Sequence, residues 1–288
     1  MSPERRPYRY RLVDVFTTEP FAGNSLAVVP NAHGLDDRAM QLIAREFNLS
    51  ETTFCFPATR PDCVAQVRIF SPTRELPFAG HPTIGTSFVL LDEDLIPRNT
   101  SHFALEEKVG PVPIRVDPGE RPLIWLRTPP ITYGPTRDRA TCAAALGLRV
   151  DDLLDIAPQF VSSGLPILFI PLEDPGAVDR AHPERLAALK GDDMVHGFGV
   201  FPFAPTPTGA YSRMFAPDFG MPEDAGTGSA TGPLASFMLR HGLLTGSRMT
   251  SEQGTKMGRR SLLHVVIDGD AIDVGGYVAS VATGQFTL

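Results

Sequence analysis

The stretch Arg68-Ile-Phe-Ser-Pro72 returns later in the chain as Arg213-Met-Phe-Ala-Pro217, with its arginine, phenylalanine and proline at a constant offset of 145 residues. In the same register Gly80 falls on Ala225, and each stretch leads into an apolar segment with the character of a helix. Self-similarity at a fixed offset is typical of a structural unit that is used twice. The repeat therefore predicts two similar units, with a chance match between common turn residues as the alternative.

The length and composition of the chain agree with two such units. Its 288 residues exceed the ~150 that are typical of one domain, and 42% of them are hydrophobic and 20% charged, as in globular proteins. The 28 prolines and 26 glycines disfavour a helical bundle and favour many short strands. We expect an N-terminal lobe over residues 1–129 and a C-terminal lobe over residues 130–288, with a linker at 127–137 and the last strand, about 279–288, pairing with the N-terminal lobe.

Charge and apolar patterning disfavour several classes of partner. The 26 basic and 33 acidic residues give a net charge of −7, which opposes binding to nucleic acid or to an anionic membrane. The longest apolar run, Leu165–Leu172, is interrupted by two prolines and is too short to span a membrane, and the N-terminal residues lack the apolar core of a signal peptide. Three cysteines without CxxC spacing indicate neither a disulfide framework nor a zinc ribbon. A cytoplasmic protein is expected.

Local patterns predict the elements along the chain. A helix that begins at Asp36 or Asp37 and ends near Asn48 has Met40, Ile43 and Phe47 on one apolar face, and a second helix from His81 has Ile84, Phe88 and Leu91 on one face. Short helices are expected at 138–148 and 183–190. The strands and hairpin segments are expected at 10–16, 25–29, 52–57, 63–70, 103–126, 159–160 and 167–171.

Two glycine-rich segments stand at loop-to-helix junctions: Phe78-Ala-Gly-His-Pro-Thr-Ile-Gly-Thr86 and Glu223-Asp-Ala-Gly-Thr-Gly-Ser-Ala-Thr-Gly232. A helix start leaves several N–H groups unpaired and carries partial positive charge, so it favours a bound carboxylate by about 0.3–2 kcal/mol. Each segment also has an ionisable side chain, His81 or Asp224. For either segment alone, glycines that only permit a tight turn are the simpler interpretation. Their equivalent placement in the repeat favours a binding site.

Several motifs along the chain carry a family resemblance. They are Phe21-Ala-Gly-Asn-Ser-Leu-Ala-Val28, Ile43-Ala-Arg-Glu-Phe-Asn-Leu-Ser-Glu-Thr-Thr-Phe54, Ile69-Phe-Ser-Pro72, Glu75-Leu-Pro-Phe-Ala-Gly-His-Pro-Thr-Ile-Gly-Thr86 and Glu223-Asp-Ala-Gly-Thr-Gly-Ser-Ala230. In combination they resemble the PhzF family of phenazine biosynthesis proteins over essentially the whole chain. The resemblance implies an α+β fold of the diaminopimelate epimerase-like superfamily. Such a fold has two pseudo-symmetric lobes, each a mostly antiparallel β-sheet curled round a central helix, and an active site in the interlobe cleft.

The resemblance also implies roles for single residues. Glu51 falls on the family's catalytic glutamate, a general acid/base that takes a proton from an activated carbon and returns it at another position. His81 and Asp224 fall on the polar pair beside the substrate. The expected substrate-binding set, from the resemblance and the helix starts, is Asn24, Gly80, Thr83, Gly226, Thr227, Gly228 and Ser229. No metal site and no cofactor is expected. A homodimer is expected, because homodimers are common in families that this one resembles.

These expectations define a function and its alternatives. We expect a cofactor-independent isomerase that moves a proton on a small carboxylated, cyclic or unsaturated metabolite. Distant relatives racemise with a cysteine at each helix start, and none of Cys55, Cys63 and Cys142 lies in either motif. An isomerase is therefore preferred to an epimerase or racemase. A catalytically silent small-molecule binding protein on the same fold is the other alternative, and the presence of Glu51 favours an enzyme.

Other enzyme classes lack their motifs. No GxSxG nucleophile elbow and no HExxH metal motif occurs, and the spacing Gly226-x-Gly228-x-x-x-Gly232 departs by one residue from a dinucleotide-binding loop. In Gly258-Arg-Arg-Ser261, Arg260 stands where the family often has proline, so a local loop is expected to differ. The resemblance does not identify the substrate.

Overall fold

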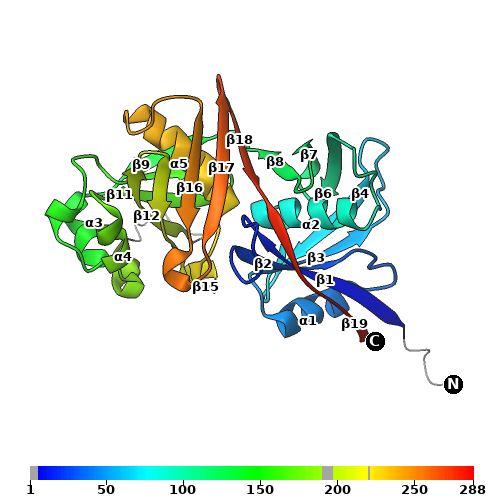
Figure 1. Cartoon of the computed structure of the whole chain (residues 1–288). Coiled ribbons are helices and arrows are strands. Elements are labelled where there is room, and N and C mark those ends of the chain that lie inside the picture. The colour runs from blue at the N-terminus through cyan, green and yellow to red at the C-terminus, as the bar shows by residue number, and fades with distance from the viewer. Residues whose placement is uncertain (1–5, 190–196, 220) are drawn as a thin grey trace. The chain divides into compact units, whose positions relative to one another are not determined.

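The computed structural model describes residues 6–189, 197–219 and 221–288, which form two compact units (Figure 1). The first unit contains the chain up to residue 126 together with residues 275–288. The second contains residues 127–274. Each unit combines a mixed β-sheet with one long buried helix.

The first unit is built on one mixed sheet. Its order is β19-β1-β2-β3-β4-β6-β7-β8, with β5 paired to β4; the β2/β3 and β4/β6 pairs are parallel and the other pairs are antiparallel. The strands are β1 (Pro7–Val15), β2 (Asn24–Val29), β3 (Glu51–Phe56), β4 (Ala65–Phe70), β5 (Glu75–Leu76), β6 (His102–Glu107), β7 (Gly110–Asp117), β8 (Leu123–Arg127) and β19 (Val278–Thr287).

Helix α1 (Asp37–Phe47) forms where the sequence predicts it. The Asp36 carboxylate caps the helix by accepting a hydrogen bond of 2.7 Å from the Ala39 N–H, and Asn48 ends it in a left-handed conformation with φ 51°. Met40 and Ile43 are buried against the sheet, so the predicted apolar face is confirmed. The β3–β4 hairpin that follows α1 is confirmed as well.

Helix α2 (Gly80–Asp92) is the central helix of the first unit and contacts β1, β2, β3 and β19 (Figure 1). Eleven of its 13 residues are buried, so burial extends well beyond the predicted face of Ile84, Phe88 and Leu91. The helix approaches the sheet closely at Gly85, because a Cβ at this position would lie 2.6 Å from Leu26 Cδ2 and 2.8 Å from Val15 Cγ2. A helix that is buried on all sides needs apolar residues on all sides.

The second unit repeats this plan. Its sheet has the order β9-β10-β11-β12-β13-β16-β17, with parallel β11/β12 and β13/β16 pairs, and β14 pairs with β12 and β15. The strands are β9 (Thr132–Thr136), β10 (Gln159–Ser162), β11 (Pro166–Pro171), β12 (Gly199–Thr206), β13 (Gly209–Ser212), β14 (Met214–Ala216), β15 (Met221–Asp224), β16 (Arg248–Gln253), β17 (Ser261–Asp268) and β18 (Ala271–Gly276). The helices are α3 (Arg139–Ala145), α4 (Pro175–Arg180), α5 (Gly228–Arg240) and the short 3-10 helices η1 (Val150–Asp152), η2 (Pro183–Leu189), η3 (Pro217–Phe219) and η4 (Thr255–Met257).

The two units share one order of elements. An antiparallel pair (β1/β2, β10/β11) is followed by a helix (α1, α4) and by a strand that runs parallel to the second strand of the pair (β3, β12). Then come its antiparallel partner (β4, β13), the central helix (α2, α5) and a strand parallel to that partner (β6, β16). Helices α2 and α5 both have 13 residues. In each, the threonine in the fourth position bonds the carbonyl four residues earlier, over 2.7 Å from Thr83 Oγ1 to Ala79 O and 2.9 Å from Thr231 Oγ1 to Thr227 O. The internal repeat is therefore structural.

The structure corrects the register of the repeat at the helix starts. Gly80 does not correspond to Ala225 but to Gly228, the first residue of α5. The reason is the length of the segment before the helix, since Gly228 stands 11 positions after Pro217 whereas Gly80 stands 8 positions after Pro72. In the second unit this segment begins with the 3-10 helix η3 and includes β15.

Two other predicted elements also differ, and one helix of the structure was not predicted. The expected linker at 127–137 contains β9, which pairs with β10. The expected helix at 183–190 is the 3-10 helix η2 as far as Leu189, with a kink at Arg185, and Lys190 lies outside the described residues. Helix α4 was not predicted, although Asp174 caps it and Pro175 begins it, the usual signature of a helix start.

Candidate active site

Glu51 is the first residue of β3, where the strand pairs in parallel with β2 and places Glu51 opposite Leu26. The next four residues of β3 are apolar or hydroxylic and buried, and Glu51 itself is 8% exposed. Next to it, the Ser50 hydroxyl donates to Asn24 Oδ1 over 3.3 Å. Glu51 thus follows the loop after α1 and lies in the interior of the first unit, where a carboxylate is uncommon.

His81 lies beside Glu51. It is the second residue of α2 and is 5% exposed, and its Nε2 lies 3.4 Å from Glu51 Oε2. Its Nδ1 lies 3.4 Å from the side-chain nitrogen of Asn24. Burial lowers the pKa of His81 to about 3, against which a hydrogen bond with the Ser25 backbone acts in the opposite direction. His81 is therefore a neutral imidazole near neutral pH.

The start of α2 supplies the third component of this group. Ala79 is the N-cap residue and offers no side-chain cap, and the first turn contains no acidic residue. The first N–H groups of a helix have no partner within the helix and carry its positive dipole end. Asn24, Glu51 and His81 are thus brought together in the first unit beside Gly80, at a helix start that favours an anion, whereas the Thr83 hydroxyl contacts Ala79 O and Glu107.

The second unit contains a separate polar cluster at the start of α5. The Thr227 hydroxyl donates to Asp224 Oδ2 over 2.5 Å, and the Thr227 N–H donates to Gln253 Oε1 over 3.1 Å. Gln253 Nε2 in turn donates to the Asp224 carbonyl over 2.8 Å and to Thr227 Oγ1 over 2.9 Å. Asp224 is 8% exposed and Gln253 is fully buried. The cluster fixes the loop from Asp224 to Thr227 in front of the helix.

This cluster changes the roles that were expected of single residues. Both donors of Thr227 are engaged inside the protein. Gly228 and Ser229 occupy the first two positions of α5, where N–H groups have no partner within a helix. Gln253 was not predicted, because its partners are 26 and 29 residues away and the sequence around it has no motif.

The comparisons with known proteins identify the fold and the family. The family model for phenazine biosynthesis-like proteins (PhzC-PhzF) matches residues 13–284. The chain belongs to this family. The trans-2,3-dihydro-3-hydroxyanthranilate isomerase of Pseudomonas aeruginosa is 34% identical over 289 residues, covering 98% of this chain and 100% of the relative.

Solved structures confirm the α+β, diaminopimelate epimerase-like fold of this PhzF-family chain. A PhzF-family protein of Bacillus anthracis matches with a TM-score of 0.88 at 23% identity, over 98% of this chain and 100% of that chain. A probable proline racemase of Agrobacterium radiobacter matches with a TM-score of 0.66 at 13% identity, over 98% of this chain and 93% of that chain. Both are similar in fold along nearly their whole length.

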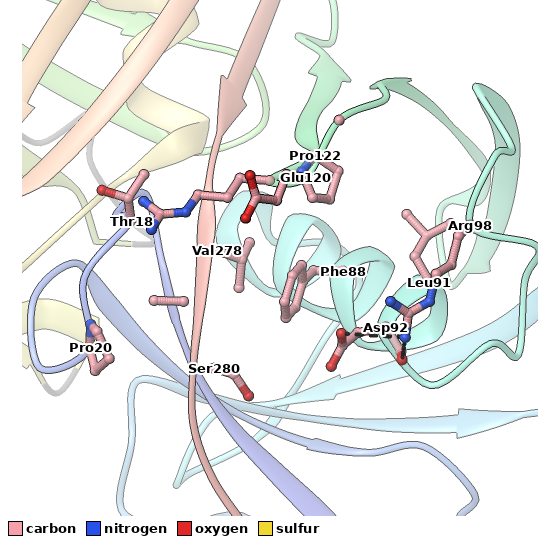
Figure 2. A pocket seen from close by; sticks show the side chains of 13 residues that line it. Thr18, Pro20, Phe88, Leu91, Asp92, Arg98, Glu120, Pro122, Val278 and Ser280 are labelled. Atoms are coloured by element: carbon pink, nitrogen blue, oxygen red, sulfur yellow. Dashed lines mark hydrogen bonds and ion pairs between the residues drawn. The ribbon is translucent and has the colours of Figure 1, made fainter.

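A pocket of about 360 Å³ also lies in the first unit, on the C-terminal half of α2 (Figure 2). Phe88 and Asp92 line it from the helix, and Ser280 from β19. Two of its polar side chains are engaged, since Arg11 Nη2 donates to Asp92 over 2.8 Å and to Ser280 over 2.6 Å. No residue of the predicted site lines this pocket.

Within residues 6–189, 197–219 and 221–288, no group of three or more His, Cys, Asp or Glu side chains is arranged to hold a metal ion. No helix in the same ranges has both the length and the apolar character of a membrane span.

Proposed function

We propose that the chain is a cofactor-independent isomerase that moves a proton on a small carboxylated, cyclic or unsaturated metabolite, with Glu51 as general acid and base. The isomerase class rests on the family and on the P. aeruginosa relative, which carries the name of an isomerase. The observation that carries the role of Glu51 is its buried carboxylate, whose Oε2 lies 3.4 Å from His81 Nε2 at the start of α2.

The proposed step needs only the protein and the substrate. The Glu51 carboxylate takes a proton from an activated carbon, so that a C–H bond breaks and an O–H bond forms. The electron pair enters the unsaturated system of the substrate and shifts its double bond. Glu51 then returns the proton to a second carbon. Substrate and product have the same composition, and no oxidant or reductant is consumed.

His81 fits the role of an orienting group. Since burial holds its pKa at about 3, it carries no charge that would neutralise Glu51. A neutral imidazole can still donate one hydrogen bond and accept another, and the contacts of 3.4 Å to Glu51 and Asn24 fix its ring between two neighbours. We assign His81 the task of holding the reacting part of the substrate against Glu51.

The helix starts fit the role of carboxylate binding. The uncapped start of α2 presents Gly80 and His81 without an acidic residue in its first turn. Gly228 and Ser229 offer the same kind of site at α5, and Asp224, held by Thr227, is assigned a polarising role on the substrate. A kinetic double-mutant cycle on Glu51 and Asp224 tests whether the groups at the two helix starts act on the same substrate molecule.

The chemistry of the cysteines favours this reaction over two-thiol racemisation. Neither helix start contains a cysteine. Burial raises the pKa of Cys55 and of Cys142 to about 12, so neither forms a thiolate near neutral pH. One carboxylate can serve both steps of a proton shift on one face of the substrate, whereas inversion needs a group on each face.

The test uses trans-2,3-dihydro-3-hydroxyanthranilate as the first substrate, with turnover in D2O followed by NMR. Glu51→Gln should lower kcat by about 10²–10⁴-fold, the usual contribution of general acid–base catalysis, and leave substrate binding within a few-fold of the wild type. Glu46→Gln, an exposed glutamate on α1, is the control and should retain full activity. An undiminished rate in Glu51→Gln would refute the role of Glu51 as general acid and base. Inversion of a stereocentre by the wild type would favour an epimerase. Substrate binding without turnover would favour a catalytically silent binding protein.

A further inference from the structure

Glu107 is a buried carboxyl group that takes no part in the reaction described above. It is the last residue of β6 and is 4% exposed. Its Oε1 lies 2.5 Å from Thr83 Oγ1, and Thr83 Oγ1 lies 2.7 Å from the Ala79 carbonyl oxygen. Ala79 is the N-cap of α2 and Thr83 closes its first turn. A chain of three oxygen-bearing groups thus runs from Glu107 to the start of the central helix.

The hydrogen count along this chain determines the state of Glu107. The Thr83 hydroxyl has one hydrogen but contacts two acceptors, Glu107 Oε1 and Ala79 O. If Glu107 were ionised, one of these short oxygen–oxygen contacts would lack a hydrogen and would be repulsive. If Glu107 is protonated, its O–H donates to Thr83 and Thr83 donates to Ala79, so both contacts are hydrogen bonds.

Burial and the surroundings agree with the protonated form. Glu107 Oε2 is buried and accepts no hydrogen bond from the described residues, and no cation among them forms an ion pair with this carboxyl group. Charges that are buried without a partner are strongly disfavoured. Burial raises the pKa of Glu107 to about 8, and the Thr83 hydrogen bond acts in the opposite direction.

The second unit provides an internal comparison. Gln253 is the last residue of β16, as Glu107 is the last residue of β6, and the two strands hold the same place in their units. Gln253 braces the start of α5 by donating through its amide to the Asp224 carbonyl and to Thr227. A neutral donor, Gln253, therefore holds the start of α5, and a protonated Glu107 is its counterpart at the start of α2.

We propose that Glu107 is a positioning residue, held as the neutral acid, that fixes the first turn of α2 through Thr83 and leaves the positive helix start available to the substrate carboxylate. This inference rests on the proposed function for its substrate, but not for the state of Glu107. Ionisation of Glu107 would break the relay to Ala79. It would also place a negative charge beside the helix start, where it competes with the anion that is to bind.

The other charged groups around Glu107 are engaged elsewhere. Arg68 and Lys108 both pair with Glu75, over 2.7 and 3.4 Å, and Glu106 accepts hydrogen bonds from Thr59 and Arg60. Apart from Glu107, the charged or titratable side chains on β3, β4, β5, β6, β7, the β6–β7 turn and α2 are Glu51, Cys55, Arg68, Glu75, His102, Glu106, Lys108, Arg115, Asp117, His81 and Asp92. Within the described residues, none of these forms a hydrogen bond or ion pair with Glu107.

The kinetic test compares KM and kcat of the wild type, Glu107→Gln and Glu107→Ala between pH 6 and 9.5. Above about pH 8 the wild-type KM should rise relative to that of Glu107→Gln by up to about tenfold per pH unit, with kcat little affected. Glu107→Ala should raise KM at every pH, and Glu107→Gln should restore it to within about twofold of the wild type at pH 7. The same alkaline rise of KM in Glu107→Gln, or no rescue by Gln, would overturn the positioning role.

A second measurement needs no substrate and separates this inference from the proposed function. In the wild type Glu107 keeps its proton on folding, so stability falls as pH rises from about 4.5 to 8. The Tm of Glu107→Gln should therefore gain on that of the wild type over this range. Glu106→Gln, on the neighbouring residue whose pKa is lowered by its hydrogen bonds, should show a constant Tm difference between pH 5.5 and 8. A constant difference for Glu107→Gln would overturn the neutral-acid state, even if turnover proved the isomerase.

Discussion

Arg213 and Glu223 are joined by two hydrogen bonds of 2.8 Å, and the same arginine stacks over Phe215 with its Cζ 4.7 Å from the ring centre. In the first unit, Arg68 bonds Glu75 over 2.7 Å and lies 5.2 Å from the Phe70 ring centre. The Arg-x-Phe repeat in the sequence is thus a repeated ion pair and cation–π contact, whose acidic partner lies on the short strand β5 in the first unit and on β15 in the second.

Replacement of Arg213 by Met should lower the free energy of unfolding by about 3–5 kcal/mol. The arginine is buried, and its loss leaves Glu223 without a cation and the carbonyl of Ala181 without the 2.8 Å hydrogen bond that it accepts from Nη1. Urea denaturation measures the effect. The control is Arg60→Ala, which removes an exposed pair with Asp62 and should cost less than about 1 kcal/mol. Equal losses in the two variants would contradict a structural role for the repeated pair.

His81→Asn should reduce the loss of stability in mild acid. Because burial lowers the pKa of His81 to about 3, the unfolded chain binds a proton below about pH 6.5 that the folded chain does not. Stability contributed by the neutral histidine is therefore lost as pH falls from about 6.5 towards 3. Denaturation of both proteins at pH 7 and pH 5 should show the smaller decrease in the variant. A parallel decrease would show that His81 titrates normally in the folded protein.

Thr83→Val should be more destabilising than Thr231→Val, although the two threonines hold equivalent helix positions. Among the residues that the structure describes, the Thr231 hydroxyl bonds to the carbonyl of Thr227 alone, whereas Thr83 contacts both Ala79 O and the buried Glu107. Removal of Thr83 Oγ1 leaves the Glu107 carboxyl group buried without a partner, which costs about 1–3 kcal/mol. Thermal unfolding of the matched pair checks this, and a larger effect at Thr231 would count against the relay.

Gly85→Ala should destabilise the first unit by about 1–3 kcal/mol, the usual cost of overpacking. A methyl group at this position would stand 2.6 Å from Leu26 and 2.8 Å from Val15, both of which are fully buried. Gly119→Ala is the control, since its Cβ would find its nearest neighbour at 3.7 Å, and it should change stability by no more than about 0.5 kcal/mol. A neutral Gly85→Ala would mean that α2 can move away from the sheet.

The sequence predicts the fold class and those elements whose signals are local. Helix α1 follows from the Asp36 cap, its apolar spacing and Asn48, all of which act within one helix. The register of the repeat fails at Ala225 because it depends on the length of a loop, which the motifs on either side do not constrain. Burial of α2 on all sides depends on the sheet around it, so the periodicity of its own residues underestimates it.

The same difference between local signals and long-range contacts applies to the candidate site. Glu51, His81 and Asp224 can be found from the sequence because they belong to motifs. Glu107 and Gln253 cannot, because their partners lie 24 to 29 residues away and are brought to them by strand pairing. One local signal was present for Glu107. Side chains alternate along β6, which places Glu107 on the same buried face as Leu105, where a carboxylate is unusual.

The antiparallel pair of β1 and β19 has a consequence for how the protein is made. Pro7 lies opposite Thr287, so the sheet of the first unit includes a strand that leaves the ribosome only after the whole second unit. Until then, β1 has one neighbour, β2, and its other edge is open. The first unit must therefore complete its folding after the second has been synthesised, and during that interval the exposed edge of β1 is the place where newly made chains are most prone to associate wrongly.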